Sequence, residues 1–210
     1  MNILHIDVSP RPVSHSRQLS AGIIEKILEV VPDAQITRRD LGAAPIPHAT
    51  ADYATTLSSP ATLATPIVGS LDLAEPLIEE VDGADILVIG TPMHNFTVPS
   101  VLKAWIDQVI RAGRTFVSTP AGKVGLLRDR PVFVGIASGG TFTHEHSTQV
   151  DFLRPYLRAA LDCIGLKTVQ FLTVEATAFL EGDKARIARE KGLEPIDLTV
   201  ISQVLSPEGA

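Results

Sequence analysis

The chain has 210 residues, 45% of them hydrophobic, which is enough to bury one substantial core, so we expect a single domain over residues 1–210. Its net charge of −6 and scattered basic residues exclude the electrostatic pattern of proteins that bind nucleic acid or anionic membranes. A single cysteine, no signal-peptide pattern and no apolar run near the roughly 20 residues of a membrane span favour a cytoplasmic protein.

The first half of the chain alternates between strand and helix patterns. Residues 2–8 form a short apolar run that ends in a proline-rich turn, which predicts a strand. From Ser16, apolar residues recur at helical spacing until Pro32 stops the pattern. Residues 35–41 alternate apolar and polar side chains, as an edge strand does, whereas residues 84–90 are continuously apolar, as a central parallel strand is.

Residues 43–76 form a long segment rich in proline, alanine, serine and threonine. We expect a loop that covers part of a ligand pocket or contributes to a dimer contact, because loops of this length in compact domains are usually functional. A disordered surface excursion is the alternative.

The second half opens with the clearest helix pattern, over residues 98–110. Thr97 is the expected N-cap, Pro99 lies in the first turn, and Gly113 is expected to close the helix.

Four further elements complete the chain. We expect a central strand at 131–137, a helix at 148–163, a strand at 168–174, and a closing helix at 182–206 that is kinked at Pro195.

Strands that alternate with helices predict an α/β fold, a doubly wound five-stranded parallel sheet with helices on both faces, in three layers. Such sheets bind ligands beyond the carboxyl ends of their strands, where the strand order reverses. If the order is 2-1-3-4-5, the turns after the first, third and fourth strands share one rim and form a single site.

The first of these turns is rich in hydroxyl groups and leads directly into a helix. Ser9, Ser14 and Ser16 can donate hydrogen bonds, and the N-terminus of a helix attracts anions. Because neither a G-x-x-x-x-G-K-[ST] nor a G-x-G-x-x-G motif is present, a phosphate monoester is the favoured ligand. The alternative is that Ser14 or Ser16 only caps the helix.

The second turn is stiffened by Pro92 and can present backbone groups to the edge of a flat heterocycle. Met93 and Phe96 add surface against which a ring can pack, and Asn95 offers a donor and an acceptor. The alternative is that Met93 and Phe96 are core residues and that Asn95 stabilises the turn.

The third turn contains Ser138, Gly139, Gly140 and Thr141. The two glycines allow a ligand to approach the backbone, although for this segment alone a simple tight turn is the better explanation. The three turns together carry the prediction.

Four segments, "SPRPVSHSRQLS", "PMHNFTVPSVLKAWIDQVIRAGRTF", "ASGGTF" and "PYLRAALDCIGL", resemble in order and spacing the FMN-dependent NADH:quinone oxidoreductases, also known as azoreductases. The similarity extends over nearly the whole chain and includes "RDLGAAPIP". It implies a flavodoxin-like FMN-binding domain and a homodimer with FMN at the subunit interface. It also implies ping-pong reduction of quinones and azo compounds by NADH or NADPH.

The resemblance assigns three groups of residues to FMN and no catalytic side chain, because the cofactor supplies the chemistry. The groups are Ser9, Ser14, His15 and Ser16 around the phosphate, Met93, His94, Asn95 and Phe96 along the isoalloxazine, and Ser138, Gly139, Gly140 and Thr141 near its pyrimidine end.

The chain departs from the family at three positions. His94 stands where well-known members have tyrosine, and Ser118 and Cys163 stand where they offer aromatic residues to the substrate pocket. Because fewer rings give less stacking, we expect a preference for small quinones over bulky azo dyes. The resemblance also places residues 118–130 near the pocket of the partner subunit.

Two other readings of the sequence are weaker. His144 and His146 have no further ligands beside them in the sequence to complete a metal site, so we expect no metal. Cys163 is expected to pack as a small apolar side chain rather than to act as a catalytic thiol.

The alternative function is a flavodoxin-type electron carrier, which would pass single electrons to a protein partner.

Overall fold

Five segments of the chain pair into one parallel sheet in the computed structural model, which describes residues 1–145 and 147–205. The strands are β1 (Asn2–Asp7), β2 (Gln35–Asp40), β3 (Ile86–Pro92), β6 (Val132–Ala137) and β7 (Val169–Val174). Their order is β2-β1-β3-β6-β7, and every neighbouring pair is parallel. The predicted order of the sheet is therefore confirmed, with β2 at an edge and the apolar strands β3 and β6 inside.

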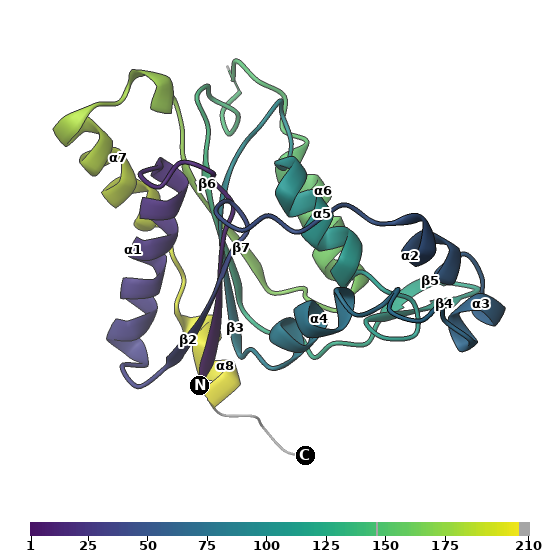
Figure 1. Cartoon of the computed structure of the whole chain (residues 1–210). Helices are drawn as coiled ribbons and strands as arrows, with labels where there is room; N and C mark the ends of the chain where they lie inside the picture. The colour runs from purple at the N-terminus through teal and green to yellow at the C-terminus, as the bar shows by residue number, and fades with distance from the viewer. Residues whose placement is uncertain (146, 206–210) are drawn as a thin grey trace.

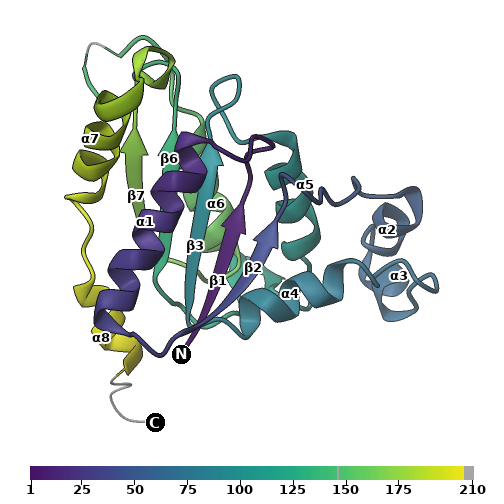
Figure 2. The same ribbon diagram turned by 60° about the vertical axis from the view of Figure 1, so that its left-hand side comes forward.

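Helices cover both faces of the sheet, so the molecule has three layers (Figures 1 and 2). One face carries α1 (His15–Val30) and α7 (Gly182–Leu193), and the other carries α4 (Ala74–Asp82), α5 (Ser100–Val109) and α6 (Leu153–Cys163). A last helix, α8 (Thr199–Leu205), adds Ile201 to the core on the α1 side.

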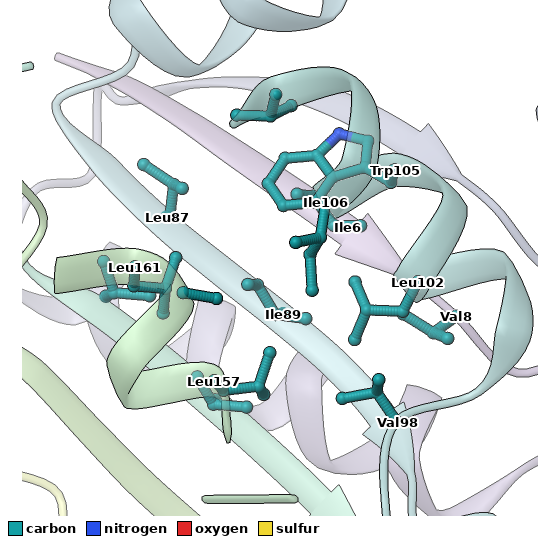
Figure 3. Close-up of a cluster of buried hydrophobic side chains, with 14 of the residues drawn as sticks. Ile6, Val8, Leu87, Ile89, Val98, Leu102, Trp105, Ile106, Leu157 and Leu161 are labelled. Carbon is teal, nitrogen blue, oxygen red and sulfur yellow. The ribbon is translucent and has the colours of Figure 1, made fainter. Parts of the chain in front are cut away.

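The two cores follow from the alternation of side chains along each strand. In β3, Leu87 and Ile89 belong to the core under α5 and α6, whereas Ile86 and Val88 belong to the core under α1. Figure 3 shows the larger core, where Trp105 and its neighbours on α5 pack toward the sheet. Continuous apolar sequence in β3 is thus required because both of its faces are buried.

Helix α5 has the predicted apolar stripe but different ends. Pro99, not Thr97, is the N-cap, and no side chain caps the helix, because Thr97 is instead paired with His94 in the preceding turn. The helix ends at Val109, and Gly113 lies beyond it in a turn with φ of 74°.

Two other predicted helices also differ from the structure. Helix α6 begins at Leu153 and not at residue 148, because Thr148 bonds to Thr141 in the loop before it. The closing helix is two helices, α7 and α8, because the segment between them contains Pro195 and Asp197, whose carboxylate accepts from Thr199 N–H at 2.9 Å.

The segment 43–76 is not a plain loop, so that prediction is wrong. It contains α2 (Ala51–Thr56) and α3 (Pro60–Ala64), and α4 begins at its end. The side chain of Tyr53 is buried and donates to the carbonyl oxygen of Asp107 at 3.0 Å, which fixes the segment to α5. These helices are too short to show an apolar period in the sequence.

A two-stranded antiparallel hairpin, β4 (Phe116–Thr119) and β5 (Gly122–Gly125), lies outside the main sheet and was not predicted. It packs beside the end of α6, where Leu127 N–H donates to the Ile164 carbonyl at 3.1 Å. None of the described helices is long and apolar enough to span a membrane.

Candidate flavin site

A cleft of 310 Å³ opens at the carboxyl edge of the sheet, where the predicted turns converge. Four turns line it, those after β1, β3, β6 and β7. The lining residues are Arg11, Ser14, His15, Ser16, Pro92, Met93, His94, Ala137, Gly139, Thr177 and Ala178. The cleft therefore lies at the point where the strand order reverses, as the sheet topology requires.

The turn after β1 supplies the polar end of the cleft. Ser14 is the N-cap of α1, and its Oγ accepts from the backbone N–H of Arg17 at 3.3 Å. The hydroxyl groups of Ser14 and Ser16 lie 3.3 Å apart and are almost fully buried. Capping and ligand binding are thus compatible, because the hydroxyl groups and the free N–H groups of the first helical turn share one location.

The start of α1 lies unusually close to β3 because residue 90 is glycine. A Cβ atom there would lie 2.4 Å from Ser20 Oγ and 2.9 Å from the carbonyl oxygen of Ser16. The absence of a side chain at Gly90 therefore allows the hydroxyl-rich turn to approach the turn after β3.

His15 and Arg11 bring basic groups to the same end of the cleft. Burial, followed by the charges of Arg189 and Arg11, holds the pKa of His15 below its usual value. The imidazole Nδ1 is buried without a hydrogen-bond partner in the described part of the chain. An anion bound here would meet positive charge and a nitrogen that can serve as a donor.

The turn after β3 has a strained and well-braced backbone. Asn95 and Phe96 have positive φ angles, 47° and 73°, and the flanking residues His94 and Thr97 exchange two backbone hydrogen bonds of 3.0 Å. The Phe96 carbonyl accepts from Phe152 N–H at 3.0 Å. Left-handed backbone at a non-glycine aromatic residue is unfavourable, and it is found where a site requires a fixed shape.

Hydrogen bonds and close packing with neighbouring residues fix the turn after β6. Ser138 Oγ donates to Gln149 Oε1 at 3.0 Å, and Thr177 Oγ1 donates to the Ser138 carbonyl at 3.0 Å. Gly140 packs tightly against Gln149 and Thr148, whereas a Cβ atom on Gly139 would make only an ordinary contact with Ala178, at 3.8 Å. The first glycine is thus free for a ligand, and the second is needed for packing.

The structure brings all three predicted groups to one edge of the sheet, but only some of their residues line the cleft. The predicted residues that line the cleft are Ser14, His15, Ser16, Met93, His94 and Gly139. The others lie in the same turns without lining it, namely Ser9, Asn95, Phe96, Ser138, Gly140 and Thr141.

Five lining residues were not among the predicted site residues: Arg11, Pro92, Ala137, Thr177 and Ala178. Pro92 and Ala137 are the last residues of β3 and β6, directly before two of the predicted turns. Arg11 lies within a turn already identified, and its positive charge close to serines in the sequence could have indicated that it contributes to an anion site. Thr177 and Ala178 follow β7 and reach the same edge, so the rule applied to the other strands would have found them.

Ser118 and Cys163 do not line this cleft. Ser118 lies in β4, and Cys163 is the last residue of α6, near the hairpin. His144 lies 3.4 Å from Glu175, and His146 lies outside the described residues. Among the residues that are described, no group of three or more His, Cys, Asp and Glu side chains could hold a metal ion.

Comparisons with known proteins find relatives over most of the chain. The family described as "Flavodoxin-like fold" matches residues 1–196. FMN-dependent NADH:quinone oxidoreductase 4 of Pseudomonas fluorescens is 45% identical over 185 residues, which cover 88% of this chain and 87% of that protein. The chain belongs to the flavodoxin-like family of FMN-dependent NADH:quinone oxidoreductases. The resemblance seen in the sequence is therefore confirmed, and the protein is an oxidoreductase.

Two further relatives of the oxidoreductase span nearly the whole chain. A Mesorhizobium japonicum FMN-dependent NADH:quinone oxidoreductase is 34% identical over 208 residues, 97% of each chain. A crystal structure of an FMN-dependent NADH-azoreductase from Bacillus anthracis in complex with FMN has a TM-score of 0.77 and 25% identity, and the match covers 98% of this chain and 99% of that one.

Proposed function

We propose that this oxidoreductase binds FMN in the cleft and reduces quinones and aromatic azo compounds with electrons from NADH or NADPH. The observation that carries the proposal is the convergence of four turns on one cleft, which is polar and basic at one end. The relationship of the chain to FMN-dependent oxidoreductases supports it. The chemistry that FMN supplies when bound is two-electron transfer, from a nicotinamide nucleotide in one half-reaction and to the acceptor in the next.

The residues of the cleft fit FMN in two parts. Ser14 and Ser16, with the N-terminus of α1 and the charge of Arg11, bind and neutralise the phosphate. Met93 borders the flat ring by apolar contact, and Gly139 borders it with its exposed backbone.

Ser14 and Ser16 bond to each other, and among the described residues no hydrogen bond joins either hydroxyl to His15 or His94. The cleft thus has no serine activated by a paired base, which agrees with a reaction that depends on the cofactor.

We also propose ping-pong turnover, because a single bound FMN takes up electrons from the nicotinamide nucleotide in one half-reaction and passes them to the acceptor in the next. The nucleotide would then leave before the acceptor binds.

We also propose that the enzyme is a cytoplasmic homodimer. Three large apolar side chains on or next to the β4–β5 hairpin, Val117, Val124 and Leu126, are exposed and offer a surface for a second copy. A single free cysteine, Cys163, fits a reducing compartment.

The test is an anaerobic titration of the purified, FMN-loaded protein with NADH and, separately, NADPH. Rapid loss of flavin absorbance without a protein partner, followed by recovery on addition of a quinone, is expected. A protein that does not bind FMN overturns the proposal. FMN-loaded protein that neither nucleotide reduces would instead indicate the electron carrier.

A further inference from the structure

Arg17 occupies a position that is unfavourable for a cation. It lies in the first turn of α1, where the free N–H groups make the helix end partly positive. Two carboxylates compensate for this, since Asp40 Oδ2 lies 2.7 Å and Asp7 Oδ2 lies 3.5 Å from the guanidinium. The hydrogen bond with Arg17 lowers the pKa of Asp40 and raises that of Arg17, so the ion pair persists across neutral pH.

The other hydrogen bonds of Arg17 go to the turn that supplies the polar end of the cleft. Its Nε and Nη2 donate to the carbonyl oxygen of Ser9, at 3.0 and 2.7 Å. Ser9 Oγ in turn accepts from the backbone N–H of Arg11 at 3.3 Å. The guanidinium therefore fixes the first residue of the turn, although Arg17 does not line the cleft itself.

The turn after β2 completes this arrangement. Asp40 Oδ1 accepts from the backbone N–H of Ala43 at 2.9 Å, which orients the carboxylate toward Arg17. A Cβ atom on Gly42 would lie 2.1 Å from the Ser9 carbonyl oxygen and 2.9 Å from Arg17 Nη2. Only glycine at this position leaves room for the carbonyl to meet the guanidinium.

We propose that Arg17 and Asp40 are a positioning pair that holds the Ser9 turn in the geometry that binds the phosphate of FMN. The proposal rests on the proposed function and deepens it, because it makes the pair responsible for selecting phosphorylated flavin over riboflavin. The two side chains act through the Ser9 backbone rather than by touching the ligand. Their effect is therefore confined to the phosphate end of the cleft.

The test compares FMN with riboflavin, which has the same ring and no phosphate. Binding of each to the flavin-free full chain is measured by flavin fluorescence for wild type, Arg17→Gln and Asp40→Asn. We expect Arg17→Gln to weaken FMN binding about tenfold or more, as the loss of charged hydrogen bonds implies. Riboflavin binding is expected to stay within about twofold, and Asp40→Asn is expected to act in the same direction.

Arg39→Gln is the matched control, because Arg39 is next to Asp40 on β2 but pairs with Glu80, away from the Ser9 turn. It is expected to leave both affinities unchanged. If Arg17→Gln weakens the binding of FMN and of riboflavin equally, or weakens neither, the proposal of a positioning pair is wrong. If Arg17→Gln does not fold, Asp40→Asn decides by the same criterion.

The same titration separates the two proposals. Wild-type protein that binds neither flavin overturns the cofactor assignment and the positioning pair with it. Wild-type protein that prefers FMN, together with variants that keep the full preference, overturns the pair alone.

Discussion

His15 lies at the junction of the first turn and α1, and its pKa is lowered by burial, Arg189 and Arg11. Because the unfolded chain takes up this proton more readily, the folded state loses stability as the pH falls through the unfolded value of about 6.5. We expect the melting temperature of the flavin-free protein to fall more between about pH 7 and pH 5 in wild type than in His15→Gln, since glutamine does not titrate. Thermal unfolding at a series of pH values measures this.

His48→Gln, at an exposed position in the 43–76 segment, is the control and is expected to follow wild type. Added FMN is expected to narrow the difference between wild type and His15→Gln, because a phosphate stabilises the protonated imidazole. If the melting temperatures of wild type and His15→Gln without flavin change with pH in parallel, the pKa of His15 is not lowered in the folded protein.

His94 lines the cleft, and by the resemblance seen in the sequence it stands where well-known members of the family have tyrosine. Acceptor preference is therefore tested most directly at this position. A phenol ring in its place adds stacking surface for an aromatic acceptor. We expect His94→Tyr to raise kcat/KM for a bulky azo dye relative to a small benzoquinone by about two- to tenfold, as aromatic pairs contribute ~0.5–1.5 kcal/mol.

Steady-state assays with both acceptors give this ratio, and His48→Tyr, which makes the same change away from the cleft, is the control. An unchanged ratio in His94→Tyr would show that this side chain does not contact the acceptor.

Among the elements, the turn at residues 94–97 depends on residue type through its backbone angles. Asn95 has φ of 47°, which asparagine and glycine tolerate and β-branched residues do not. Asn95→Val is therefore expected to reduce the free energy of unfolding by about 1–2 kcal/mol, whereas Asn95→Gly is expected to stay within about 0.5 kcal/mol of wild type. Urea unfolding of the two variants measures this, and equal losses would mean that the turn is not strained.

The sequence predicted the elements that depend on a local apolar pattern. Strand β3 and the stripe of α5 were found because burial on two faces or on one face imposes a period that can be read directly. The ends of α5 were not found, because Thr97 has a competing partner in His94 that no local rule reveals. Helices α2 and α3 and the β4–β5 hairpin were missed because each is too short to have a period.

At the scale of the whole molecule, the exposed apolar hairpin is where we expect the second subunit to bind. Val124 in β5 is 49% exposed, and a charge there would have to be buried in the dimer. Val124→Asp is therefore expected to shift the protein from dimer to monomer. Analytical ultracentrifugation over a range of protein concentrations measures the shift.

Ile187→Asp is the matched control, because Ile187 in α7 is similarly exposed, at 44%, on the opposite face of the sheet. It is expected to leave the dimer intact. A wild-type protein that is monomeric at micromolar concentration would contradict the homodimer, and equal effects of both variants would place the interface elsewhere.

The sequence by itself determined the layers, because these follow from apolar periods. It also indicated the turns at the cleft, once the strand order was taken as 2-1-3-4-5, because parallel strands end at a common edge. Only the tertiary structure decided which residues of those turns face the cleft, since Ser138 and Gly140 are turned toward Gln149 while Gly139 lines the cleft. It also decided the role of Arg17, whose partners Ser9 and Asp40 come from two other segments of the chain. Contacts between distant segments depend on three-dimensional packing, which no local pattern encodes.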